Sequence, residues 1–323
     1  MVRLDLRGVF RRELQLTFTG SPGREPEWSA ALADGDDAGF LGPGSAAWAV
    51  HGSMAPIVAG VRALMMQALH PAALAGVHDH SRFREDPLGR LAGTIRWIFT
   101  VTYGDTTTAR TASEHVLRLH RAVTGTYRDA AGIERAYAAN DPDLLRWVHL
   151  AFTDSFLAAH LIWGSYWGGR GSIPGGPDAY VAEWAVAGEL MGVPDPPRTA
   201  AELRSQLDAY LTGGRLAHSA RLDEVMRFLR APGLSPLLQP GYRLLFDGAV
   251  ASLREPYRAL LGLERRRIGP FRLPAVLATR LVLAGVRLAL GRRGPTETSA
   301  RRRLARLRGG STASGAERPG TAP

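Results

Sequence analysis

Apolar residues recur at helical spacing along most of this chain. Between Pro56 and Leu69 they fall at Ile57, Val61 and Leu64, three or four positions apart, which is typical of one face of an α-helix. Alternating apolar and polar runs between turn pairs are scarce, so the pattern predicts an all-α fold. Equivalent spacing predicts further helices at 46–50, from Pro71, from Pro87 to about 98, and at 108–124, 144–163, 180–191, 200–212, 219–229 and within 240–261.

The pattern divides the chain into three parts. Residues 1–40 are rich in Gly, Asp and Pro and are expected to be irregular with short helices. Residues 41–290 carry the helical periodicity without an internal repeat, so they are expected to form one large helical domain. Residues 291–323 are polar and basic, and we expect a disordered tail there.

The segment from Pro274 to Leu290 has two interpretations. It is apolar except for Thr279, Arg280 and Arg287, and it is too short and too charged to span a bilayer. It is either a terminal core helix or an interfacial membrane helix followed by the basic tail. The second interpretation predicts a peripheral membrane contact.

Charge and composition narrow the function classes. The net charge is +10, but eight arginines and two glutamates from Gly291 onward account for +6 of it, so residues 1–290 carry only +4. The excess positive charge is concentrated in the tail and does not indicate a basic groove in the folded domain. No nucleic-acid-binding motif is present in the sequence, so we expect no nucleic-acid partner. Cysteine and lysine are both absent, which excludes thiolate ligands and leaves histidine and carboxylates for base or metal chemistry.

The first residues, Met1 to Arg7, contain no apolar run of the secretory type. We therefore expect a cytoplasmic location, with membrane association as the variant that the Pro274–Leu290 segment allows.

His120 is the first candidate ligand. Val116, Leu119 and Val123 lie four and one positions before it and three after it, which places His120 on their apolar helical face. His115 is expected to face more toward solvent. A neutral imidazole in such a place can bind a haem iron, although a hydrogen-bonded core histidine is the commoner explanation.

Arg90 and Thr94 are one helical turn apart and share a face. An arginine there can pair with carboxylates such as the propionates of haem, or it can form an ion pair with Asp86.

Three further histidine positions have alternative roles. His70 precedes Pro71, so the chain must turn there, and His70 either caps the preceding helix or lines a pocket. His78 and His80 flank Asp79 at a spacing that resembles a zinc or non-haem iron site, but no second group of ligands accompanies them.

Several motifs together resemble a known family, the rubber oxygenases (latex clearing proteins) and the mycophenolic-acid-pathway oxygenases. Their order and spacing, over residues 40–260, carry the resemblance. The motifs are Gly42-Pro-Gly-Ser45 with Trp48, Gln67-Ala-Leu-His70-Pro71 with Gly76-Val77 and His80-Ser81-Arg-Phe83, Asp86-Pro87-Leu-Gly-Arg90-Leu-Ala-Gly-Thr94, His120-Arg-Ala-Val-Thr-Gly125, Tyr137-Ala-Ala-Asn-Asp141-Pro142, Leu145-Arg-Trp147-Val-His149, Tyr180 with Glu183, and Gly188 with Gly192.

The resemblance implies a helical fold with a globin-like core that binds haem b. It implies that His120 is the proximal iron ligand and that Arg90 and Thr94 lie at the haem and its pocket. Relatives use dioxygen to cleave carbon–carbon double bonds in isoprenoid chains. The sequence departs from rubber-cleaving members at Gly93, where they carry lysine, and has no acidic residue from Gly39 to His78, where they have a glutamate base.

Two functions follow as hypotheses. The first is a haem-dependent oxygenase that acts with dioxygen on an apolar small molecule, with His70, Thr94 or His149 as catalytic candidates, the two histidines for proton handling. The second is a non-catalytic protein that binds haem, a gas or a lipid, which the lack of an obvious base favours.

Overall fold

The computed structural model describes residues 8–9, 12–14, 16, 25–80, 87–164, 172–265, 267–268, 271–272 and 274–314, without the side chains of 87–91, 267–268, 271–272 and 310–314. Helices account for most of the described residues. They are α2 (Glu27–Ala30), η1 (Ala31–Ala33), α3 (Ala46–His51), α4 (Pro56–Ala68), α5 (Pro71–His80), α6 (Pro87–Tyr103), α7 (Thr106–His120), α8 (Pro142–Trp163), α9 (Gly176–Leu190), α10 (Ala200–Thr212), α11 (Ala220–Arg230), α12 (Gln239–Ser252), α13 (Glu255–Leu260), α14 (Ala275–Leu290) and α15 (Pro295–Ser314).

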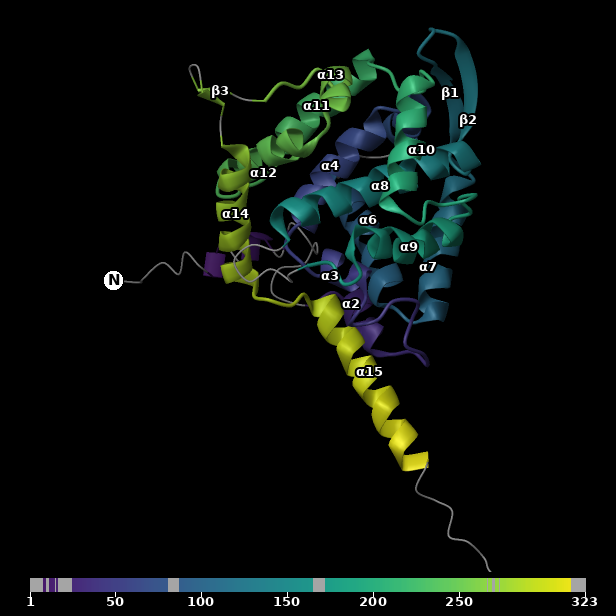
Figure 1. Cartoon of the computed structure of the whole chain (residues 1–323), viewed down its shortest axis with the longest axis vertical. Helices are drawn as coiled ribbons and strands as arrows, with labels where there is room; N and C mark the ends of the chain where they lie inside the picture. Colours follow the sequence, from purple (N-terminus) through teal and green to yellow (C-terminus); the bar gives the residue numbers. More distant parts are fainter. Residues whose placement is uncertain are drawn as a thin grey trace, which may run out of the picture.

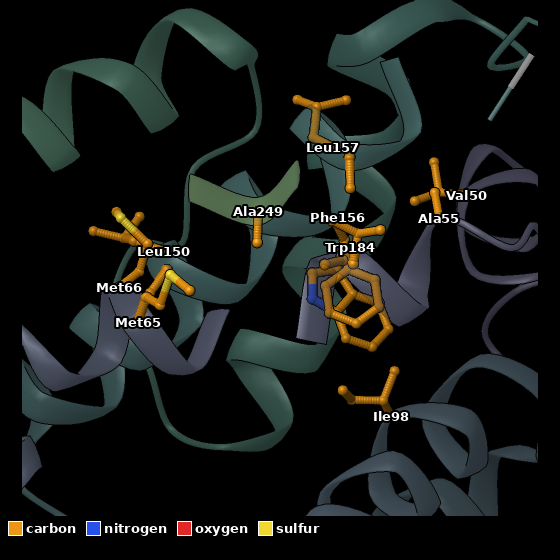
Figure 2. Packing of buried hydrophobic residues seen from close by; sticks show 14 of the residues in the cluster. Val50, Ala55, Met65, Met66, Ile98, Leu150, Phe156, Leu157, Trp184 and Ala249 are labelled. Carbon is orange, nitrogen blue, oxygen red and sulfur yellow. The ribbon is translucent and has the colours of Figure 1, made fainter. Parts of the chain in front are cut away.

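Helices α4 and α8 form the centre of the molecule (Figure 1). α4 packs along α8 on one side and α12 on another, while α14 packs on the outer side of α12 and α7 packs on α6. The buried core between them contains Trp48, Trp147 and many aliphatic residues. Figure 2 shows Met65, Met66 and Leu150 gathered in one part of this core and Phe156 and Trp184 in another. The predicted all-α fold class is confirmed.

Side-chain caps explain where several helices begin. The hydroxyl of Ser45 accepts a hydrogen bond from the Trp48 amide at the start of α3. Asp105 caps α7, Thr199 caps α10 and Ser219 caps α11 in the same way. Each cap satisfies an amide that would otherwise lack a partner in the first helical turn.

An antiparallel hairpin interrupts the helices where the sequence predicts none. Its strands are β1 (Thr124–Arg128) and β2 (Glu134–Ala138), so the helix expected to reach Thr124 ends instead at His120. The carboxylate of Asp129 stabilises the turn by accepting hydrogen bonds from the backbone amides of Ala131 and Ile133. The hairpin is polar and largely exposed, so it lacks the apolar alternation that signals a strand. A second pair, β3 (Arg267–Ile268) and β4 (Phe271–Arg272), is only two residues long on each side.

The expectation of a disordered tail from Gly291 is wrong for residues 295–314, which form α15. Arg303 of α15 is fully buried, and its guanidinium donates to the carbonyls of Leu32 and Tyr103, both at 2.8 Å. Glu297 is also buried and pairs with Arg301 one turn later, at 2.8 Å. The tail is basic in composition, but its first half packs on η1, α2 and α6.

Within the described residues, no single helix has the length and apolar character needed to cross a membrane. The pair α4 and α5 meets that criterion jointly, with a bend of 107° between the two helices.

Candidate active site

A cavity of about 1230 Å³ lies among the helices that carry the family-like motifs. Its walls come from α2, η1, α4, α5, α6, α7, α8, α9 and α11, with Tyr137 of β2 at the hairpin. The lining is mostly apolar. Its volume exceeds the roughly 300–1,000 Å³ of ordinary small-molecule sites, so the cavity has room for a large cofactor or a long apolar chain. Polar or charged described residues of the lining are Gln67, His80, Thr94, Arg96, Thr100, Thr107, Thr108, Thr111, His115, Arg118, His120, Tyr137 and His149.

His120 lines this cavity from the C-terminal end of α7. It is half-buried, and its ring lies in hydrogen-bonding contact with the Asn140 side chain. Burial lowers the pKa of His120, and the neighbouring Asn140 opposes that shift. The ring is therefore neutral at pH 7, which is the form that can bind a metal.

The surroundings of His120 differ in part from the prediction. Val116 and Leu119 do line the cavity with it, but α7 ends at His120, so Val123 reaches the cavity from the following loop. Leu119 is 58% exposed, so this face is not uniformly buried. His115 also lines the cavity but is exposed, as the pattern predicts. The two histidines thus differ in burial rather than in access to the cavity.

Thr94 of α6 lines the cavity next to Gly93. The side chain of Arg90, one turn earlier, lies outside the described residues. Two other arginines, Arg96 of α6 and Arg118 of α7, are exposed and contribute to the same lining. They bring positive charge to the cavity that the sequence analysis did not assign to it.

His149 lines the cavity from α8 and is 7% exposed. Its Nε2 atom is buried and has no hydrogen-bond partner among the described residues. Burial lowers the pKa of His149 to about 4, so this ring is neutral at pH 7.

His70 does not belong to the cavity lining. It lies between α4 and α5, with its ring near those of Trp147 and Tyr210 and its Nε2 atom 3.9 Å from a carboxylate oxygen of Asp143. The chain turn at Pro71 directs this side chain toward α8 and α10. We therefore leave His70 out of the proposed site.

His78 and His80 do not form the metal-binding site that their spacing resembles. His78 contacts the carboxylates of Asp79 and Glu224, at 2.8 and 3.1 Å, and the Nε2 atom of His80 lies 2.8 Å from the Thr124 carbonyl. Among the described residues, no three His, Asp or Glu side chains are placed to hold a metal ion.

Two further polar groups of the lining have no role in the sequence analysis. The Nε2 atom of Gln67 on α4 and the hydroxyl of Tyr137 on β2 are buried without hydrogen-bond partners in the described part of the chain. Both residues stand within motifs quoted above. The motifs mark them as part of a pattern, but only the structure shows that both residues line one cavity, with these two polar atoms buried behind its surface.

This fold and cavity define an all-α protein with a large, mostly apolar internal site. The chain belongs to the family described as ER-bound oxygenase mpaB/B'/Rubber oxygenase, catalytic domain, whose model matches residues 48–286. Membership of an oxygenase family supports an oxidoreductase activity. The comparisons with curated proteins and with solved structures returned no match.

Proposed function

We propose that the protein is a haem b-dependent oxygenase that oxidises an apolar small molecule with dioxygen. The observation that carries this proposal is a mostly apolar cavity, in an oxygenase family fold, with the neutral His120 in its wall. The isoprenoid class suggested by the resemblance is the first class of substrate to test.

The donor chemistry of the cavity suits haem better than a directly coordinated metal ion. A porphyrin supplies four ligands to its iron, so the protein needs to add only one side chain. His120 offers a neutral imidazole in the cavity wall, with the Asn140 side chain beside the ring. Non-haem iron needs two histidines and a carboxylate together, and no such group occurs among the described residues.

Other lining residues have roles that fit this cofactor. Arg96 and Arg118 can pair with its carboxylates, and the Arg90 side chain is a third candidate from the sequence. Thr94 contributes a hydroxyl to the cavity. When bound, haem supplies the oxygen chemistry; the apolar walls hold the substrate and exclude water.

Two residues that the rubber-cleaving relatives use, a lysine and an acidic base, have no counterpart in the described cavity lining. Gly93 stands where rubber-cleaving relatives have lysine, and the whole sequence has no lysine. No aspartate or glutamate is found among the described residues of the lining. We therefore propose oxidation of an apolar small molecule by a route that uses neither of these two residues, with His149 as the remaining candidate for proton handling.

The lack of a lining carboxylate also favours the second candidate, a protein that binds haem or a lipid without turnover. Oxygen uptake separates the two. Purified protein, supplied with haem, would be incubated under air with an isoprenoid alcohol or aldehyde, and the products would be analysed by mass spectrometry. The oxygenase account predicts substrate-dependent oxygen consumption, and products that carry the label when the air is replaced by labelled dioxygen. Substrate binding without oxygen consumption would favour the non-catalytic candidate.

A further inference from the structure

Part of the cavity wall comes from a segment near the start of the chain. α2 and η1 contribute Trp28, Ala31 and Leu32 to the lining, and these three residues are called the terminal wall below. The family model matches residues 48–286, so the terminal wall lies before the matched region and α15 lies after it. Two segments from opposite ends of the chain are thus additional to the matched domain, and one of them reaches the cavity.

α15 holds the terminal wall from its outer side. It packs on both α2 and η1 (Figure 1). The guanidinium of Arg303 donates a hydrogen bond to the Leu32 carbonyl at 2.8 Å. One carboxylate oxygen of Glu25 accepts hydrogen bonds from the hydroxyls of Ser29 and Ser299, at 2.9 and 3.0 Å, and both serines are buried. The position of α2 and η1 therefore depends on α15.

The segment that follows η1 is attached to α7. The carboxylate of Asp37 accepts hydrogen bonds from the backbone amide of Thr106, at 2.9 Å, and from the hydroxyl of the same residue. Thr106 is the first residue of α7, and the next two residues, Thr107 and Thr108, line the cavity. The terminal wall is thus fixed between α15 and the helix that carries His120 at its other end.

Trp28 has the largest side chain of the terminal wall. It is half-buried and packs against the main core, whereas Leu32 is 2% exposed and belongs to that core. An indole ring is large and rigid, so it defines the shape of an apolar site more sharply than a flexible side chain does. In an apolar pocket one methylene group changes the binding free energy by roughly 1–3 kcal/mol. A side chain as large as Trp28 can therefore decide which apolar molecules fit.

We propose that Trp28 is a specificity-determining residue that limits the length of the apolar molecule the cavity accepts, and that Arg303 of α15 is its positioning residue. Removing the indole extends the cavity at the terminal wall, so longer molecules gain contacts that shorter ones cannot reach. The inference rests on the proposed function in one respect, namely that the substrate binds in this cavity. It requires neither haem nor turnover.

The test compares the binding of isoprenoid alcohols of increasing length. Geraniol, farnesol and geranylgeraniol would displace Nile red from the purified full-length protein. The measured quantity is the ratio of two dissociation constants, that of geraniol divided by that of geranylgeraniol. We expect Trp28→Ala to raise this ratio about tenfold, which is about 1.4 kcal/mol. Trp28→Phe keeps an aromatic ring and should raise it less. A ratio is used because a loss of folded protein affects all three alcohols equally.

Two further variants separate the side chain from its support. Glu27 is exposed and does not line the cavity, so Glu27→Ala is the matched control and should keep the parent ratio. Arg303→Ala releases the carbonyl beside the terminal wall and should raise the ratio, and Ser299→Ala, a milder change at the same contact, should do so to a smaller extent. The double variant Trp28→Ala/Arg303→Ala should not exceed Trp28→Ala alone, because Arg303 acts through the position of Trp28.

The outcomes distinguish this inference from the proposed function. An unchanged ratio in folded Trp28→Ala, or an equal rise in Glu27→Ala, overturns the role of Trp28. A parent that binds none of the three alcohols also contradicts the inference. Additive effects of Trp28→Ala and Arg303→Ala overturn the positioning role of Arg303. A parent that shows the expected ratios but binds no haem and consumes no oxygen contradicts only the proposed function.

Discussion

At the scale of single residues, the structure shows His115 exposed, as the helical pattern predicts, and His120 half-buried in the wall of the same cavity. His120 lines the cavity from a half-buried position and His149 from a buried one, while His115 lines it from an exposed position. Helical periodicity predicted His120 beside Val116 and Leu119, and all three line the cavity, although Leu119 is 58% exposed and Val123 lies beyond the end of α7. It could not show that His70 turns away from the cavity, because that depends on how α8 and α10 pack against the turn at Pro71.

The first prediction concerns the iron ligand. Replacing His120 with alanine removes the proposed axial ligand, so haem content should fall sharply and the spectrum of a histidine-bound haem should be lost. The His115→Ala variant should retain both, because His115 is exposed and makes no such bond. Haem content and ferrous spectra of the two variants would be compared with the parent, with circular dichroism to confirm folding. Loss of haem in His115→Ala, with a normal spectrum in His120→Ala, would move the assignment to His115.

The second prediction concerns acid stability. Burial lowers the pKa of His51 to about 3 and the pKa values of His70 and His149 to about 4, from an ordinary value of 6.5. Between pH 6.5 and these values the unfolded chain binds more protons than the folded one, so stability is lost as pH falls. The free energy of unfolding should decrease by roughly 1.4 kcal/mol per pH unit for each histidine.

His51 provides the sharpest test of this dependence. Its ring nitrogens contact the hydroxyls of Thr102 and Tyr180 at 2.7 and 3.0 Å inside the core. Urea unfolding at several pH values between 7 and 4.5 should show a shallower dependence for His51→Gln than for the parent. The exposed His218→Gln should match the parent. Equal slopes for all three proteins would contradict the assignment of this dependence to buried histidines.

At the scale of elements, the spacing of apolar residues predicted most helices. Composition was a poor guide to which segments pack against the core. The helix predicted at 200–212 has the observed bounds of α10, because its apolar positions and its Thr199 cap agree. The hairpin was missed because its exposed strands lack an apolar face. α15 was missed because an arginine-rich segment looks fully solvated, although one arginine, Arg303, reaches backbone carbonyls inside the molecule.

The third prediction concerns α15. Arg303 bonds the carbonyls of Leu32 and Tyr103, so it ties the helix to η1 and to the end of α6. Arg303→Ala leaves these buried acceptors unpaired and should cost about 3 kcal/mol of stability. The nearby Arg302 is exposed, so Arg302→Ala should change stability by less than about 0.5 kcal/mol. Thermal unfolding of the two variants measures the difference, and equal melting temperatures would show that α15 does not contribute to the fold.

At the scale of the whole molecule, the ordered motifs carried more information than any local pattern. They identified the family that the comparison confirms over residues 48–286. The structure places Thr94, His120 and His149, which lie far apart in the sequence, in the lining of one cavity. The motifs could not reveal the cavity's volume or its unpartnered atoms, since both arise from how the helix faces meet in three dimensions.

The central claim is that this cavity holds haem b, and an absorption spectrum of the purified protein tests it most directly. The protein would be expressed with a haem supply, and spectra would be recorded with and without reductant, followed by acid–acetone extraction and metal analysis. The account predicts a Soret band that shifts on reduction, about one iron per chain, and complete extraction of the haem because the chain has no cysteine for covalent attachment. A colourless protein that takes up no added haem, and carries stoichiometric zinc or non-haem iron instead, would contradict it.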